Sequence, residues 1–203
     1  MFAWTKEHSG DYGGAVDAYR KLGKVPGGGT NRMIQIKNAN DLMKSGRREE
    51  ALNTMRDALE PNARQPFRTP VALTEYGEMA LLMGHADEAS EAFRRAIEVK
   101  VTTSKHLPRV VSKTGSIAEL RASAHFSCGN WGMNRGQGPS SGVEFSKAVE
   151  LVPDWSAVRA YRAENLRRLN KRSESRKEFE VLAKDRDPEV AAFAAKQLES
   201  LRT

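Results

Sequence analysis

The residue types that most often carry chemistry are sparse in this chain. Its 203 residues include one cysteine, Cys128, and four histidines, at positions 8, 85, 106 and 125. His125 lies three residues before Cys128, so on a helix the two side chains would share a face. Such a pair offers two metal ligands, or a thiol beside a base. A zinc site needs about four ligands, and a nucleophilic cysteine needs an orienting third group and an oxyanion site.

Neither requirement is met elsewhere in the sequence. The other histidines are scattered, and no second cysteine is present. A lone cysteine is most often a small buried hydrophobic residue, so we favour a packed helix pair at His125 and Cys128. Adjacent acids such as Glu49 and Glu50 are typical of a solvated helix face. We therefore expect no catalysis, no metal site and no cofactor.

The glycine-rich segments lack the pattern of a phosphate-binding loop. Residues 129–142 hold five glycines and Pro139, but no lysine follows the glycines as such a loop requires. The glycine run at 27–29 has no strand before it and predicts a Gly/Pro-rich connection over 23–31. Because glycine is a poor helix former, we expect a frayed or irregular turn at 129–142.

Small residues recur at fixed offsets and indicate helices that pack closely together. A turn glycine is followed by a small residue five positions on, a large one nine on, and a small or apolar one twelve on. The clearest copy is Gly84, Ala89, Phe93 and Ala96, with Gly77 before it. Turns at positions 10, 46, 84, 136 and 170 give spacings of 36, 38, 52 and 34 residues. A repeated two-helix unit predicts a solenoid.

This repeat resembles the tetratricopeptide repeat (TPR) family, whose period is 34 residues. The resemblance covers nearly all of residues 1–187. It implies an all-α, right-handed α-solenoid of about five helix–turn–helix repeats that binds peptides or proteins in a concave groove. The implied single domain has repeats at about 1–26, 32–65, 70–103, 122–155 and 156–187, an insertion at 104–121 and a capping helix at 188–201.

The repeat also predicts where the helices lie. We expect them at 1–9, 12–22, 32–45, 48–59, 71–83, 86–99, 117–131, 141–151, 155–169, 172–184 and 188–201. Asp187 and Pro188 suit the start of the last helix, and three prolines predict a loop over 60–70. The first helix is about one turn shorter than the family implies, so the chain is either a fragment or its first repeat is completed by a partner.

Positions on the groove-facing helices supply the candidate partner-binding residues. An asparagine side chain can pair with both the N–H and the C=O of an extended peptide, and methionine adapts to varied apolar partners. These candidates are Asn40, Met43, Lys44, Thr74, Glu78, Phe126, Asn130, Asn134, Arg167 and Arg168. Packing between repeats is the alternative for several of them. The clamp with which some TPR proteins hold chaperone tails is absent in this register, since Ser123 and Ser127 occupy two of its positions.

A basic stretch in the fifth repeat could contact an acidic protein or RNA. Besides Arg167 and Arg168 it contains Arg159, Arg162, Lys171 and Arg172, and the whole chain has a formal charge of +7. Tyr161 is the one aromatic residue within it, so specific single-strand recognition has little support. A solvated helix face is the alternative.

The spacing of 52 exceeds the TPR period by 18 residues, and the extra segment lies within 101–120. Its basic residues are Lys105, His106, Arg109 and Lys113, against one acid, Glu119. Insertions in solenoids fall in exposed loops and often bind partners. A surface loop without function is the equal alternative.

Two classes of function remain open. The first is a non-enzymatic protein–protein interaction module, a scaffold or assembly factor within a larger complex, which binds an extended or acidic segment in its groove. The second is an RNA-associated helical repeat protein, a peripheral subunit of a ribonucleoprotein. No apolar run reaches the roughly 18–20 residues that span a membrane, and one cysteine allows no internal disulfide. We expect an intracellular protein, cytoplasmic unless a transit peptide has been removed.

Overall fold

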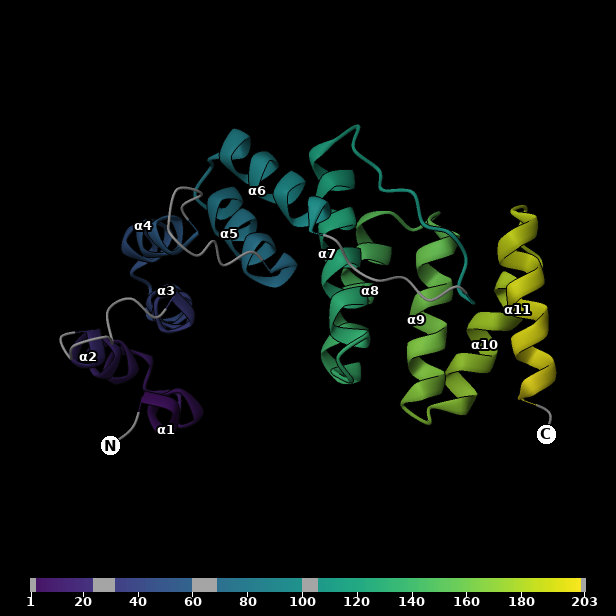
Figure 1. Cartoon of the computed structure of the whole chain (residues 1–203), viewed down its shortest axis with the longest axis horizontal. Helices are drawn as coiled ribbons and strands as arrows, with labels where there is room; N and C mark the ends of the chain where they lie inside the picture. The colour runs from purple at the N-terminus through teal and green to yellow at the C-terminus, as the bar shows by residue number, and fades with distance from the viewer. Residues whose placement is uncertain (1–2, 24–31, 60–68, 100–105, 202–203) are drawn as a thin grey trace. The chain divides into compact units, whose positions relative to one another are not determined.

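The computed structural model describes residues 3–23, 32–59, 69–99 and 106–201, which form eleven α-helices and no strand (Figure 1). The helices are α1 Ala3–His8, α2 Tyr12–Gly23, α3 Arg32–Lys44, α4 Arg48–Ala58, α5 Pro70–Leu82, α6 Ala86–Glu98, α7 Ile117–Met133, α8 Gly138–Leu151, α9 Ser156–Arg168, α10 Arg172–Leu182 and α11 Pro188–Ser200. The all-α class is confirmed. The largest disagreement lies at α8, predicted from 141 and found from Gly138. The connections predicted at 23–31 and 60–70 lie almost wholly outside the described residues.

A residue with left-handed backbone follows the first helix of each pair. Its φ angle is 79° at Gly10, 83° at Gly46, 81° at Gly84, 74° at Gly136 and 60° at Asn170. Glycine adopts this conformation without a steric penalty, and asparagine tolerates it. The next residue donates its N–H back to the helix, as in the 2.9 Å bond from Arg47 N to Leu42 O. This closure of the helix end confirms the five predicted turns.

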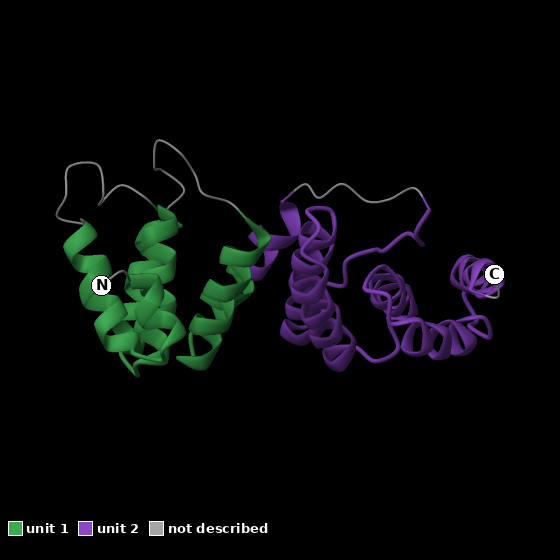
Figure 2. Cartoon of the chain, turned by 90° about the horizontal axis from the view of Figure 1, so that it is seen from below, with its two compact units in different colours: residues 1–92 green, residues 93–203 purple. Residues whose placement is uncertain are grey.

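The chain divides into two compact units, Met1–Ala92 and Phe93–Thr203 (Figure 2). In unit 1 each helix from α1 to α5 packs on the next, and Tyr76 of α5 donates a hydrogen bond to Glu88 of α6. In unit 2 each helix from α7 to α11 packs on the next, and α9 also contacts α7 and α11. Stacking in chain order is the arrangement of an α-solenoid. The handedness and the continuity of one domain stay predictions.

The repeated small and large residues form the centres of the helix pairs. The small residues five positions after the turn are buried, and so are the large residues nine positions after it. The small residues are Ala15, Ala51, Ala89, Ser141 and Ser175; the large ones are Tyr19, Met55, Phe93, Phe145 and Phe179. Close packing of this kind fixes the helices of a pair against each other.

The irregular turn predicted at 129–142 is wrong. Helix α7 continues through Gly129 to Met133, and α8 begins at Gly138. The glycines lie where helices touch: a Cβ atom on Gly129 would be 2.6 Å from Cε1 of Phe145, and one on Gly138 would be 2.8 Å from Cδ2 of Leu169. Tertiary contact therefore outweighs the low helix propensity of glycine here.

A buried carboxyl group joins the first three helices of unit 1. Asp41 of α3 is 2% exposed and interacts with Glu7 of α1, which also accepts a hydrogen bond from Tyr19 of α2. Burial, together with the charge of Glu7 and a hydrogen bond to it, raises the pKa of Asp41 to about 6. Lys44 and Lys37 act in the opposite direction. The ordinary value is 3.8.

This raised pKa predicts that unit 1 loses stability as the pH rises. Between about pH 4 and pH 6 the folded protein binds a proton at Asp41 more tightly than the unfolded chain does, so the free energy of unfolding falls across that window. Asp41→Asn stays neutral and should remove this part of the fall. The measurement is urea denaturation from pH 4 to 7, followed through amide NMR signals of α2 and α3. Asp17→Asn, at an exposed carboxyl, is the control, and an unchanged slope in Asp41→Asn would contradict the assignment.

The contact at Gly129 predicts that alanine substitution has opposite effects on stability at two helical glycines. Gly129→Ala should lower the free energy of unfolding of unit 2 by about 1–3 kcal/mol, because the new methyl group has no room beside Phe145. Gly13→Ala in α2 meets nothing within 4 Å and should stabilise the chain by about 0.5–1 kcal/mol. Urea denaturation followed by tryptophan fluorescence measures both. Equal effects of the two changes would refute the packing argument.

Candidate functional site

An extended segment, residues 106–116, lies along the helices of unit 2, and we call it the strap. It precedes α7 and forms neither helix nor strand. Figure 1 shows it as the coil that leaves the start of α7 and reaches the space between α9 and α11. Helices α7, α9 and α11 belong to one row, since α9 contacts both of the others. The strap therefore crosses this row. The row contains the first helix of each repeat in unit 2, and we call its surface the A face.

Apolar side chains anchor the strap to the A face. Leu107 and Pro108 are buried, and Leu107 belongs to a cluster that includes Phe126 of α7, Trp155 and Tyr161. Val110 is half-buried against this cluster and against a second cluster built from α9, α10 and α11. Burial of one leucine side chain contributes about 1.5–3 kcal/mol, so these contacts hold the segment on the helices.

Hydrogen bonds fix the main chain of the strap at two places. The hydroxyl of Ser123, a buried residue of α7, accepts from the N–H of Lys113 at 2.9 Å and donates to its C=O at 2.8 Å. On α11, Glu189 Oε1 accepts from the N–H of Arg109 at 2.9 Å. The Lys113 ammonium lies 3.4 Å from Asp154 Oδ1. Ser123 thus satisfies both main-chain groups of one residue in an extended segment.

These contacts change the interpretation of the insertion. The described part is a loop with six of its eleven residues exposed, but it is anchored to the helices, because Leu107 and Pro108 are buried and Ser123 holds the main chain. Of the basic residues that the sequence singled out, His106 and Arg109 are exposed, while Lys113 is paired with Asp154. Lys105 lies outside the described residues.

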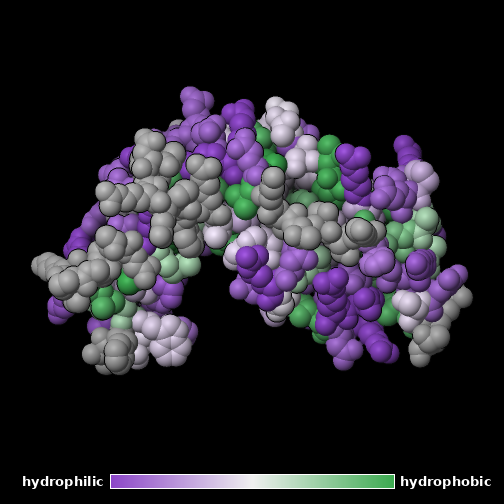
Figure 3. Space-filling view, viewed as in Figure 1, coloured by the Kyte–Doolittle hydropathy of each residue, from purple (hydrophilic) through white to green (hydrophobic). Residues whose placement is uncertain are grey.

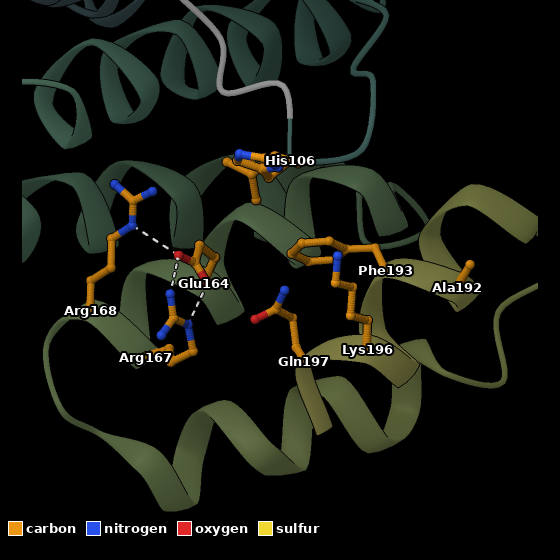
Figure 4. A pocket seen from close by; sticks show the side chains of 9 residues that line it. His106, Glu164, Arg167, Arg168, Ala192, Phe193, Lys196 and Gln197 are labelled. Atoms are coloured by element: carbon orange, nitrogen blue, oxygen red, sulfur yellow. Dashed lines mark hydrogen bonds and ion pairs between the residues drawn. The ribbon is translucent and has the colours of Figure 1, made fainter. Parts of the chain in front are cut away.

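A pocket of about 620 Å³ opens where the strap begins, between α9 and α11 (Figure 4). Leu107, Ala192 and Phe193 form its apolar part. Its polar side chains come from both helices and from the first strap residue: His106, Glu164, Arg167, Arg168, Lys196 and Gln197. Figure 4 shows the two arginines around Glu164 on one side, and Lys196 with Gln197 on the α11 side.

The pocket carries an excess of positive charge. Glu164 is 5% exposed and accepts hydrogen bonds from Arg167 at 2.7 and 2.9 Å and from Arg168 at 2.9 Å. Burial raises the pKa of Glu164, but the two guanidinium groups outweigh it and the pKa is lowered, so the carboxylate is charged. One carboxylate thus faces two arginines and Lys196. An anionic group beside an apolar one is the ligand that this chemistry favours.

Acidic residues offset part of the charge in the rest of the predicted basic stretch. Arg159 and Arg162 both contact Glu178, at 3.2 and 2.6 Å, and Lys171 lies 3.6 Å from Glu174. Arg172 is exposed at the start of α10. Figure 3 shows hydrophilic side chains gathered over the lower part of α9 and its neighbour. This surface alternates in charge and is not a continuous cationic patch.

Several other groove candidates are interior residues. Phe126, Asn130 and Thr74 are buried, so they contribute to packing between helices. Asn134 is exposed at the end of α7, with its Nδ2 atom 3.4 Å from Asn130 Oδ1. In unit 2 the structure brings Arg167 and Arg168 together at the pocket. The binding roles of all these residues stay predictions.

The candidates of unit 1 lie on α3 and α5. Asn40 donates a hydrogen bond to Glu75 at 3.2 Å, and the Lys44 ammonium lies 4.9 Å from the centre of the Tyr12 ring. Met43 and Glu78 are half-buried. The Asn40 and Lys44 side chains thus link one helix of unit 1 to another.

Sequence reasoning missed most of the pocket and all of the strap's anchors. Ser123 was considered only as a replacement of a clamp residue, although its place on the first helix of a repeat was a usable signal. Leu107, Phe193, Lys196 and Gln197 were not singled out, because the insertion was treated as a loop and α11 as a cap.

The pair at His125 and Cys128 lies in the interior. His125 Nδ1 is 2.7 Å from Glu144 Oε2, and both His125 and Cys128 are buried. Within the described ranges, no group of three or more His, Cys, Asp or Glu residues could hold a metal ion. None of the described helices has the length and apolar character needed to cross a membrane.

Comparison with known proteins leaves the function open. No family model and no curated protein matches the chain. Among solved structures, a MamA protein is 16% identical over 98% of this chain and 91% of its own, with a TM-score of 0.46. A tetratricopeptide repeat protein from Parabacteroides merdae is 18% identical over 99% of this chain and 76% of its own, with a TM-score of 0.43. TM-scores this low carry no argument, so the resemblance to TPR proteins rests on the repeat in the sequence.

The double hydrogen bond to Lys113 predicts that Ser123→Ala loosens the strap. The substitution removes two hydrogen bonds from the N–H and C=O of the half-buried Lys113, at a cost of about 1–3 kcal/mol in total. Amide hydrogen exchange at residues 109–114 should become faster, and trypsin should cut sooner after Arg109 and Lys113. Ser127→Ala is the matched control, since the Ser127 hydroxyl donates within its own helix, to Ser123 O. Equal exchange in the two variants would show that Ser123 does not hold the strap.

Proposed function

We propose that this protein is an interaction module that binds an extended segment of a protein partner, with an acidic group of that segment in the pocket between α9 and α11. The observation that carries the proposal is the pocket's composition. It combines an apolar part at Leu107 and Phe193 with cations from two helices, around a single buried carboxylate.

The size of the pocket supports a side chain or a chain end as its occupant. Ligand pockets are typically about 300–1,000 Å³, and this one, at about 620 Å³, lies within that range. Its opening between two helices admits a chain from solvent. A peptide that places an aspartate or glutamate beside an apolar side chain would use both parts of the pocket.

The electrostatics favour an anion without demanding a large rearrangement. Glu164 already holds Arg167 and Arg168 in place through hydrogen bonds, so little side-chain entropy is lost when an anion arrives. Lys196 is exposed on α11 and makes no ion pair within the described part of the chain. A partner carboxylate would therefore gain most from Lys196.

No observation favours RNA as the ligand. The arginines of the basic stretch contact Glu164 and Glu178, and Tyr161, the aromatic residue within it, is 1% exposed and cannot stack on a base.

The proposal predicts that Lys196→Glu weakens binding of acidic peptides. Random ten-residue peptides displayed on phage are selected against the full chain, and the enriched peptides are measured by fluorescence anisotropy. We expect aspartate or glutamate beside apolar residues. Lys196→Glu should reduce affinity by about ten-fold, which corresponds to roughly 1.4 kcal/mol. Lys184→Glu, an equal charge change at an exposed residue outside the pocket, should leave affinity within about two-fold.

Two outcomes would count against this function. One is the absence of any acidic consensus among the selected peptides. The other is tight binding of a labelled twenty-nucleotide oligouridine that Lys196→Glu and Lys184→Glu weaken equally, because that result would indicate general attraction to nucleic acid.

A further inference from the structure

The strap occupies the A face in the way that a bound peptide would. It is extended, its Leu107 and Pro108 are buried, and Leu107 packs in a cluster with side chains of α7 and α9. Its main chain pairs with Ser123 and Glu189. Capture of an extended segment by a helical surface needs these same elements: pockets for some side chains, and polar groups for the main chain. The A face is therefore built to hold an extended chain, whichever molecule supplies it.

We infer that the A face beneath the strap is a second interaction surface, specific for an extended, uncharged-to-basic segment of a protein partner. That segment would place an apolar residue followed by proline where Leu107 and Pro108 lie. The strap is its internal occupant, which the partner displaces. This surface adjoins the acidic-group pocket, which His106 and Leu107 of the strap help to line, but it would take a segment of different charge, because the strap residues 106–116 include no aspartate or glutamate.

The strap itself indicates the partner's chemistry. A residue before proline is restricted to extended backbone, so the Leu107–Pro108 pair is already in the bound conformation and loses little entropy on docking. Val110 packs three residues further on, while Val111 is 69% exposed. A partner segment needs apolar residues at the positions of Leu107 and Val110 and tolerates any residue at the position of Val111.

The anchors of the strap are few enough for displacement. Beyond Leu107, Pro108 and the half-buried Val110, the strap is fixed by Ser123, by Glu189 and by the ion pair of Lys113 with Asp154, and its residues 114–116 are exposed. A tethered occupant acts at an effective concentration of about millimolar. A free segment must therefore make additional contacts, or bind after the strap is loosened.

A peptide of the strap's own sequence, residues 106–116 with a fluorescein label, tests this inference. Its binding to the full chain is measured by anisotropy, with wild type compared to Leu107→Ser/Val110→Ser, in which the strap loses its apolar anchors. The double variant should bind the peptide at least about ten-fold more tightly than wild type, because its A face is open. Val111→Ser, at the exposed position, is the control and should behave as wild type.

Two further changes locate the bound peptide. In the double-variant background, Ser123→Ala should weaken binding, because it removes the partner of the peptide main chain. Lys184→Glu, at an exposed residue outside the pocket, should leave binding unchanged. The strap peptide has no acidic residue, so its binding is a separate readout from the binding of acidic peptides. Equal affinity for wild type and the double variant, or no binding to either, would overturn the inference.

A second form of the experiment keeps every anchor intact, in case the double variant does not fold. A cleavage site for a specific protease is inserted between Thr114 and Gly115, and the purified full chain is then cut. Cutting frees one end of the strap and lowers its effective concentration. The labelled peptide should bind the cut protein and not the uncut one. No difference between the two forms, in protein that remains helical by circular dichroism, would also overturn the inference.

Discussion

Two antiparallel helices can approach closely only where small residues face each other, and the rest of this structure depends on that constraint. Each pair is closed by a left-handed residue such as Gly136, and its interior holds a small residue next to a large one, such as Ser141 and Phe145. At Gly129 the approach leaves no space even for a methyl group beside Phe145. The helices of a pair are thus fixed by contact, and helix propensity is secondary.

Stacking in this manner leaves one row of helices partly uncovered. In unit 2 the row is α7, α9 and α11, and apolar side chains such as Phe126 would face solvent without a cover. The strap supplies that cover through Leu107 and Val110, while Ser123 satisfies its main chain. Where the strap begins, a charged pocket stays open. The pocket and the strap-covered face are neighbouring parts of one row, with different chemistry and different expected ligands.

The fold was predictable because its signals are local. A turn residue and the side chains at five and nine positions after it lie within one helix pair. From these short spacings the sequence predicts eight of the ten helix ends beside the turns to within one residue, as at Gly46 and Gly84. The prediction of an irregular turn at 129–142 failed because of a tertiary contact: Phe145 packs where a side chain at Gly129 would lie. The local sequence pattern around Gly129 does not indicate such a contact.

The site was predictable only in part. Arg167 and Arg168 were selected from their helix position, and both line the pocket. Phe126 was selected in the same way and is buried, because the helix position indicates a face but not what covers it. The strap joins residues far apart in sequence: Arg109 bonds to Glu189, 80 residues away. Contacts over that separation depend on the folded stack, and spacing along the chain does not indicate them.

The most direct test of this account is whether the strap lies on the A face in solution. The measurement is nuclear Overhauser contact between the methyl groups of Leu107 and Val110 and the aromatic rings of unit 2, in methyl-labelled full-length protein. The account predicts contacts from these methyl groups to the cluster of Phe126, Trp155, Tyr161 and Phe193. It also predicts a slowly exchanging amide at Lys113. Random-coil chemical shifts over residues 106–116, without any such contacts, would contradict it.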